Sequence, residues 1–417
     1  MRHKYLNKFL SNNFLVLILI NLGNLFAYLF QILLGSNLSV ADYGEFNALN
    51  SLLIYVSPIA IIVPLIISRY TAIFDIRDSK KINGLINYVF KNLFILTFLI
   101  LIILLLLFNF IYNNLNISSA TNLYLTIFLI SITVFALVPI GILQGRENFL
   151  KFSIISSSTN YVKFFLLLLL LYYNLINIHN VFIIIIIAVL STFFAGLFFT
   201  RDYLKITNVS ISSDEKNDLI KYIFPIFLST IFVQTLIGSD IIFVRIFLDP
   251  ESSGLYSMAA VLSKILYFLP ASLIFVLFPR VVKENELNDN KNKSLMVSFA
   301  LTFLIGFIAV IIIYFFKSEI IFFTFKQTDE LVSDTFFYLS LCMFLFSLVN
   351  IIIASYSAKN NFKYLYIMFF GIIIYFLLFY INHENINSII INMLTTSFII
   401  LIVFLIYYFI ESKKISS

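Results

Sequence analysis

The sequence predicts an all-α polytopic membrane protein with about twelve transmembrane helices in two six-helix bundles. Three observations lead to this fold class: an apolar composition, a regular series of apolar segments with alternating loop charge, and an internal repeat. Of the 417 residues, 61% are hydrophobic and 12% are charged. Soluble domains carry roughly 45–50% apolar and about 25% charged residues. A chain with so few charged side chains cannot cover the surface of a soluble protein of this length.

Apolar segments long enough to cross a bilayer, which takes roughly 20 residues, recur along the whole chain. The first is too long for a signal peptide and no small-residue cleavage site follows it, so we interpret it as the first span. The predicted spans are 13–35, 46–68, 89–111, 121–143, 153–173, 180–200, 221–247, 255–278, 295–316, 335–356, 363–381 and 388–410.

The positive charges sort the connecting segments into two classes. Of the 27 Lys and Arg residues, 22 lie in or beside the two termini and every second loop, whereas the alternate loops hold only Lys317 and Lys326. Cytoplasmic loops carry an excess of Lys and Arg. The pattern therefore places both termini in the cytoplasm, with the chain in the bacterial plasma (inner) membrane. All loops are short, so we expect no soluble domain.

Two landmarks recur at nearly one offset. Gly44 aligns with Gly254 at an offset of 210 residues, and Arg146 aligns with Lys359 at an offset of 213. We therefore predict two domains, residues 1–208 and residues 209–417, each with six helices. An even number of helices gives both halves the same orientation, as in the parallel repeats of transporters, whose substrate sites lie near the midplane between halves.

Four ionisable residues fall within the predicted spans: Lys163, Lys264, Arg245 and Asp240. A charge at the centre of a membrane helix costs roughly 2.5–3.5 kcal/mol on insertion scales, so such residues are candidates for function. We predict that the three cations bind substrate and that Asp240 couples an ion. The alternatives are structural ion pairs for Lys163 and Lys264, pairing of Asp240 with one of these cations, and an Arg245 side chain that reaches the outer interface.

Polar side chains accompany these charges. Asn24 and Gln31 share a stripe on the first span, Asn160 lies one turn before Lys163, and Gln234 lies on the seventh span. We expect them to line a polar cavity and bind substrate, although such stripes also join helices to one another. Three cations against one carboxylate predict an electropositive interior suited to a phosphate or pyrophosphate. Prolines in the second, seventh and eighth spans predict helix kinks.

Several classes of chemistry have no signature here. The sequence has no GxxxxGK[ST], HExxH or GxSxG motif, and its three histidines and single Cys342 show no metal-ligand spacing. We therefore expect no cofactor, no metal site and no nucleic-acid partner, and a transporter rather than an enzyme.

Short motifs along the chain resemble a known family: Tyr43-Gly44-x-Phe46, Leu-Gln-Gly-Arg at 143–146, Asp240, Gly-Leu-Tyr-Ser-Met-Ala at 254–259, Leu-Pro at 269–270 and Phe-Pro-Arg at 278–280. The chain resembles the polysaccharide (O-antigen and capsule-type) flippases of the multidrug/oligosaccharidyl-lipid/polysaccharide exporter superfamily. The resemblance implies a V-shaped, alternating-access transporter. It matches Asp240 to the family's acidic residue in helix 7, while Ile241 replaces the cation that often follows.

The resemblance also implies a cargo. Members of this family move undecaprenyl-pyrophosphate-linked oligosaccharide from the cytoplasmic to the outer leaflet for cell-surface polysaccharide biosynthesis. The expected partners are this lipid-linked oligosaccharide, membrane lipids and a polysaccharide polymerase. Two alternatives stay open: an exporter of drugs or other small amphiphiles from the same superfamily, and a membrane enzyme such as a polymerase or ligase.

Overall fold

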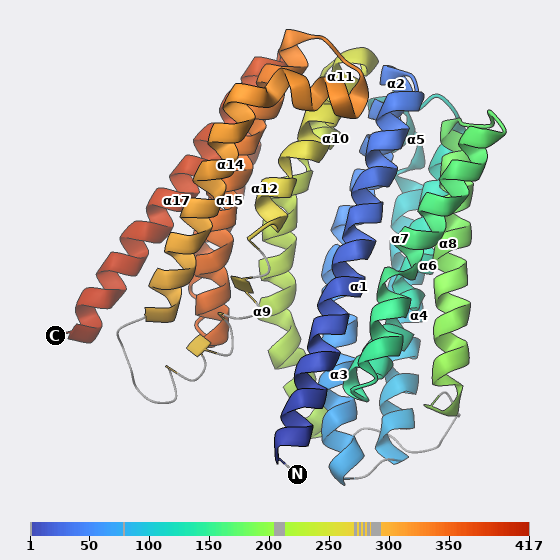
Figure 1. Ribbon diagram of the computed structural model, residues 1–417, viewed down its shortest axis with the longest axis vertical. Helices are drawn as coiled ribbons and strands as arrows, with labels where there is room; N and C mark the ends of the chain where they lie inside the picture. The colour runs from blue at the N-terminus through green and yellow to red at the C-terminus, as the bar shows by residue number, and fades with distance from the viewer. Residues whose placement is uncertain are drawn as a thin grey trace. The chain divides into compact units, whose positions relative to one another are not determined.

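The regular elements in the described part of the computed structural model are all helices (Figure 1). The structure describes residues 2–77, 80–203, 213–270 and 293–416, together with residues 273, 274, 277, 280, 281 and 284. Within these residues ten helices are long and apolar enough to cross a membrane, or eleven when the bent pair α9–α10 is included as one span. The predicted all-α polytopic membrane fold is confirmed. The eighth predicted span, 255–278, ends among residues outside the described part.

Two compact units make up the chain. Unit 1 holds residues 1–38 and 52–227, and unit 2 holds residues 39–51 and 228–417. The predicted domain boundary at residues 208 and 209 lies outside the described residues, and the two-domain division stays a prediction. The short segment 39–51 departs from a simple division, because it belongs to unit 2 although the chain on both sides of it belongs to unit 1.

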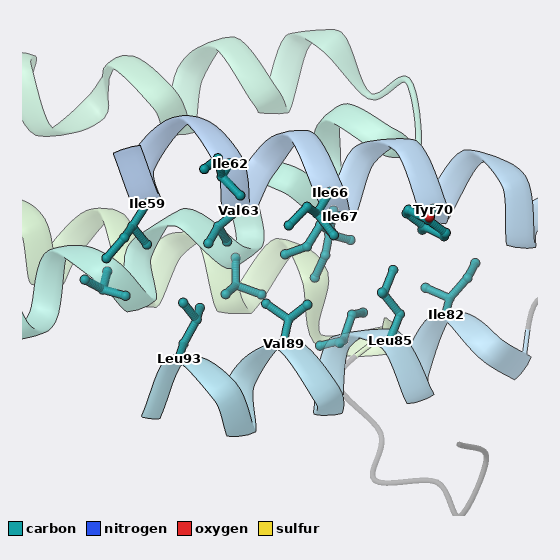
Figure 2. Close-up of a cluster of buried hydrophobic side chains, with 14 of the residues drawn as sticks. Ile59, Ile62, Val63, Ile66, Ile67, Tyr70, Ile82, Leu85, Val89 and Leu93 are labelled. Carbon is teal, nitrogen blue, oxygen red and sulfur yellow. The ribbon is translucent and has the colours of Figure 1, made fainter. Parts of the chain in front are cut away.

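Unit 1 consists of helices α1 (Arg2–Asn37), η1 (Leu52–Val56), α3 (Ser57–Arg77), α4 (Lys80–Leu106), α5 (Phe108–Asn114), α6 (Ala120–Gly145), α7 (Phe149–Tyr172), α8 (Ile178–Thr200), η2 (Arg201–Tyr203) and the first part of α9 (Ser213–Gly238). Its core is a cluster of branched aliphatic side chains. Figure 2 shows Val63 and Ile67 of α3 facing Leu85 and Val89 of α4. Their spacing of three and four residues places each set on one face of its helix.

A pair of glycines sets the distance between α3 and α6. Gly141 and Gly145 form a GxxxG pattern on α6, and a Cβ atom on Gly145 would lie 2.8 Å from Ser68 Cα of α3. A Cβ atom on Gly141 would lie 2.9 Å from Pro64 Cα on the same helix. Because lipid gives no hydrophobic drive for helix association, close backbone approach through small residues stabilises such crossings by van der Waals contact.

Unit 2 consists of α2 (Val40–Ser51), the end of α9, α10 (Asp240–Phe247), α11 (Pro250–Ser263), α12 (Ile265–Phe268), α14 (Lys293–Phe325), α15 (Glu330–Ala358), α16 (Tyr364–Ile381) and α17 (Ile386–Ser416). Helix α15 is its central element, with most of its apolar side chains buried against α11, α14 and α17. A helix that is apolar on all sides belongs inside a bundle.

Equivalent positions of the two repeats adopt the same local structure. Helices α6 and α15 both end in a residue with positive φ, Glu147 and Asn360, each at 54°. The next residue then donates its N–H over 3.0 Å to a carbonyl five residues back, Asn148 to Leu143 and Asn361 to Tyr356. These bonds satisfy carbonyls at the helix C-terminus that would otherwise have no partner.

A sharp bend of 46° separates α9 from α10. It lies at Gly238 and Ser239 rather than at Pro225, which sits inside the α9 helix. Gly and Ser pairs are a known cause of such kinks. Of the prolines expected to bend the helices, Pro279 lies outside the described residues.

Candidate functional site

The bend places Asp240 at the start of a new helix. Asp240 is the first residue of α10, and Arg245 lies in its last turn. A helix N-terminus favours a negative side chain and a C-terminus favours a positive one, so this order of charges matches the dipole of α10. Both side chains are buried: Asp240 is 0% and Arg245 is 2% exposed.

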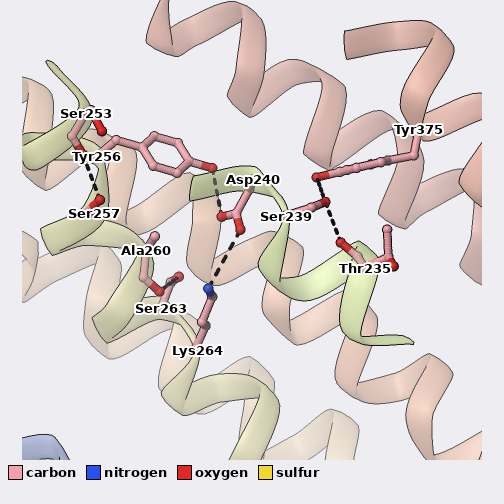
Figure 3. A network of polar contacts seen from close by, with 10 residues as sticks. All are labelled: Thr235, Ser239, Asp240, Ser253, Tyr256, Ser257, Ala260, Ser263, Lys264 and Tyr375. Atoms are coloured by element: carbon pink, nitrogen blue, oxygen red, sulfur yellow. Dashed lines mark hydrogen bonds and ion pairs between the residues drawn. The ribbon is translucent and has the colours of Figure 1, made fainter. Parts of the chain in front are cut away.

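Asp240 is held by a cation and a phenol from the next helices (Figure 3). Lys264 Nζ lies 3.7 Å from Asp240 Oδ1, and Tyr256 donates its hydroxyl to Asp240 Oδ2 over 3.1 Å. Lys264 sits where α11 ends and α12 begins. Its side chain is 15% exposed whereas that of Asp240 is fully enclosed. An incoming anion can therefore reach the lysine but not the carboxylate.

Hydroxyl groups satisfy the backbone at the bend. Ser239 donates its hydroxyl to the Thr235 carbonyl over 2.6 Å and lies 3.0 Å from the Tyr375 hydroxyl of α16 (Figure 3). In a bilayer an unsatisfied carbonyl costs several kcal/mol, so side chains of this kind are needed wherever a spanning helix breaks. The break that positions Asp240 is thus fixed from α16.

A second buried ion pair lies at the other end of α10. Arg245 Nη2 is 3.7 Å from Glu45 Oε2 of α2, and Arg245 Nη1 is 3.4 Å from the Ala41 carbonyl. The alternative in which Arg245 extends to the outer interface is wrong, because its guanidinium is enclosed. A direct substrate-binding role for Arg245 stays a prediction, and the enclosed position gives it no accessible face in this structure.

Glu45 is the residue that sequence reasoning missed. It stands in the Asp-Tyr-Gly-Glu-Phe stretch at the start of the second predicted span, where we took it for a loop residue. With Glu45 buried in unit 2, the expected ratio of three cations to one carboxylate is wrong. Arg245 and Lys264 are both balanced within unit 2. A signal was present, since apolar residues flank Glu45 on both sides.

Unit 1 holds a lysine of a different kind. Lys163 Nζ of α7 lies 4.9 Å from the centre of the buried Phe30 ring of α1. Within the part of the chain that the structure describes, no carboxylate lies at ion-pair distance from Lys163. A cation over an aromatic face gains attraction from the ring quadrupole and keeps its full charge. Phe30 aligns with Asp240 at the repeat offset of 210, so the ring stands where unit 2 has its carboxylate.

The other predicted site residues lie near these lysines along the chain. Helices α1 and α7 pack together, which puts the helix that carries Asn24 and Gln31 against the helix that carries Asn160 and Lys163. Asn24 is exposed, whereas Gln31 and Asn160 are half-buried. Gln234 of α9 is half-buried too, directly before Thr235. Asp240 and Lys264 come together in unit 2, while Lys163 belongs to unit 1.

The family follows from a match over most of the chain. The model of the polysaccharide biosynthesis protein family matches residues 10–284. The chain belongs to this family. As a member it carries both lysines, Asp240 and Glu45 inside the matched segment. The comparison with curated proteins gave no match.

Solved structures show the same fold for this family member. An inward-facing multidrug resistance MATE family transporter of the MOP superfamily is 12% identical, with a TM-score of 0.79 over 94% of this chain and 95% of the other. The lipid II flippase MurJ, inward closed, is 14% identical with a TM-score of 0.72 over 96% and 90%. An outward-facing MATE transporter is 15% identical with a TM-score of 0.66 over 97% and 94%. The predicted superfamily is confirmed.

Proposed function

We propose that this protein is a flippase for undecaprenyl-pyrophosphate-linked oligosaccharide. In this proposal it moves the lipid-linked sugar from the cytoplasmic to the outer leaflet of the bacterial inner membrane for O-antigen or capsule biosynthesis. Both termini are cytoplasmic, and the partners are the lipid-linked oligosaccharide, membrane lipids and a polysaccharide polymerase. Membership in a polysaccharide biosynthesis family and the fold of superfamily transporters support transport as the activity.

The observation that carries the cargo assignment is the state of the two membrane-embedded lysines. Lys163 has an aromatic ring and no carboxylate against it among the described residues, so its charge is open to an anion. Lys264 is the accessible member of its ion pair. Ammonium groups bind phosphate well as point charges, and a weakly solvated interior strengthens that attraction. A pyrophosphate diester is a ligand of matching charge.

Asp240 gives this scheme a route to ion coupling. A pyrophosphate that binds Lys264 competes with Asp240 for the same ammonium group, 3.7 Å away. A fully buried carboxylate that loses its cation is strongly destabilised, and uptake of one proton from water removes its charge. The proton leaves again when the cargo departs and Lys264 returns. Tyr256 stays hydrogen-bonded to the same carboxyl group throughout and keeps it in place.

Replacing Asp240 with asparagine is therefore expected to separate binding from turnover. Asp240→Asn removes the competitor for Lys264 while Tyr256 can still donate to the amide oxygen. We expect inorganic pyrophosphate to bind more tightly, by about tenfold for the 1.4 kcal/mol or more that a buried carboxylate contributes, and cargo translocation to become slower. Binding is measured by calorimetry and translocation in proteoliposomes. Weaker binding in Asp240→Asn would contradict the exchange.

The cargo assignment is tested by reconstitution with a fluorescent undecaprenyl-pyrophosphate oligosaccharide. Lys163→Ala and Lys264→Ala are each expected to lower the translocation rate by at least about tenfold, since each removes a cation that meets the pyrophosphate. Lys317→Ala is the matched control, because Lys317 pairs with Asp334 in a partly exposed position away from these sites. Wild-type rates in both lysine variants would contradict the pyrophosphate assignment.

The same samples separate the alternatives. The MATE structures share this fold, which favours a drug or small-amphiphile exporter as the second candidate. Such an exporter would move an amphipathic cation and leave the lipid-linked sugar in place. A polymerase or ligase would instead change the length or attachment of the sugar, which mass spectrometry of the recovered lipid detects.

A further inference from the structure

Helix α2 is docked on a unit to which its chain neighbours do not belong. The chain leaves unit 1 after Leu38, contributes Ser39–Ser51 to unit 2 and returns to unit 1 at Leu52. Within unit 2, α2 packs along α11 and against α10. A transporter that moves two units against each other must either carry such a segment along or release it.

The contact between α2 and α11 is made by equivalent glycines of the two repeats. A Cβ atom on Gly44 would lie 2.7 Å from Gly254 N, and one on Gly254 would lie 1.9 Å from the Val40 carbonyl oxygen. The two helices therefore touch backbone to backbone. Neither position leaves room for a methyl group, because backbone atoms on the facing helix cannot move aside as a flexible side chain can.

One ion pair adds to this contact and fixes its register. Glu45 follows Gly44 directly and pairs with Arg245 of α10 at 3.7 Å. Arg245 Nη1 also lies 3.4 Å from the carbonyl of Ala41, also on α2. A buried pair contributes little net stability but strongly disfavours states in which only one partner remains buried. Docked and fully released positions of α2 are thus both possible, and partly separated ones are costly.

The helix that follows α2 is of a kind that accommodates movement. Residues Leu52–Val56 form the 3₁₀ helix η1 between α2 and α3, and the Ser57 hydroxyl donates to the Ile54 carbonyl over 2.5 Å. A 3₁₀ stretch inside a longer helix has weaker hydrogen-bond geometry and often marks a hinge. It lies at the point where the chain passes from unit 2 back to unit 1.

We propose that α2 is a releasable latch: it closes on α11 through Gly44 and Gly254, is held by Glu45 and Arg245, and swings about Leu52–Val56. The proposal rests on the transport function proposed above. Loss of the latch contact would expose the face of α11 around Ser253, which is now fully buried. The charge pattern of the loops puts this end of the span on the outer side.

Cysteine labelling tests the latch without any cargo. The probe is Ser253→Cys in a Cys342→Ser background, treated with a charged, membrane-impermeant thiol reagent on purified full-length protein. We expect slow labelling of this protein and a rise of at least about tenfold on adding Gly44→Ala or Glu45→Gln, because either change favours the released state. Gly371→Ala is the matched control, since its added methyl group meets the flexible end of the Ile400 side chain instead.

The outcomes are distinguishable from those of the transport assay. Faster labelling with Gly44→Ala and Glu45→Gln, and an unchanged rate with Gly371→Ala, supports the latch. Unchanged labelling in both latch variants, or equal acceleration by Gly371→Ala, overturns it. Glu45→Gln is nearly isosteric and keeps the test decisive if Gly44→Ala does not fold. A failed latch leaves measured translocation of cargo unaffected, whereas failed translocation leaves the labelling result standing.

Discussion

Replacing Lys264 with methionine is expected to lower the free energy of unfolding by about 3–5 kcal/mol and to abolish translocation of the lipid-linked cargo. The substitution leaves the Asp240 carboxylate, 0% exposed, without a cation. It also removes an ammonium group that we assign to the pyrophosphate. Thermal unfolding in detergent measures the first effect and reconstituted translocation measures the second.

A double variant separates the two effects. Asp240→Asn with Lys264→Met leaves no uncompensated charge, and replacing a buried pair by neutral groups is often close to neutral for stability. We expect the double variant to recover most of the lost stability and still to be inactive. Recovery of translocation along with stability would mean that Lys264 has only a structural role.

The second large effect is expected at Glu45. Glu45→Ala leaves Arg245, one of the largest fully buried side chains, without its carboxylate and is expected to cost about 3–5 kcal/mol. Combining Glu45→Gln with Arg245→Met should recover most of this loss. Both proteins are compared with wild type by thermal unfolding.

The matched control is an ion pair near the surface. Lys317 and Asp334 join α14 to α15 with partly exposed side chains, so Lys317→Ala is expected to cost less than about 1 kcal/mol. If Glu45→Ala were as mild as Lys317→Ala, the guanidinium of Arg245 would have water or another anion against it. The assignment of Glu45 as its counter-ion would then be wrong.

The sequence was sufficient for the helical membrane fold. Period and length of apolar segments depend on local residues alone, so the spans could be located within a few residues. The repeat was visible for the same reason, and its landmarks at Glu147 and Asn360 have the same backbone conformation. The GxxxG pattern at Gly141 and Gly145 was also readable, although its partner helix α3 was not.

The pairing of charges could not be predicted in the same way. The Asp240–Lys264 pair was considered as one alternative, but the Glu45–Arg245 pair was not, because Glu45 was assigned to a loop. Its burial depends on α2 docking in unit 2, a contact between residues about 200 positions apart. The bend at Ser239 likewise depends on Tyr375 of α16 as well as on the local Gly-Ser sequence.

The central claim is that this family member flips a pyrophosphate-linked oligosaccharide lipid. The most direct test is the rate at which fluorescent undecaprenyl-pyrophosphate oligosaccharide crosses the bilayer of proteoliposomes that contain the wild-type protein. We predict a rate well above that of protein-free liposomes, lost in the stable Asp240→Asn/Lys264→Met variant. A wild-type rate equal to that of protein-free liposomes, with the protein folded and correctly inserted, would contradict the account.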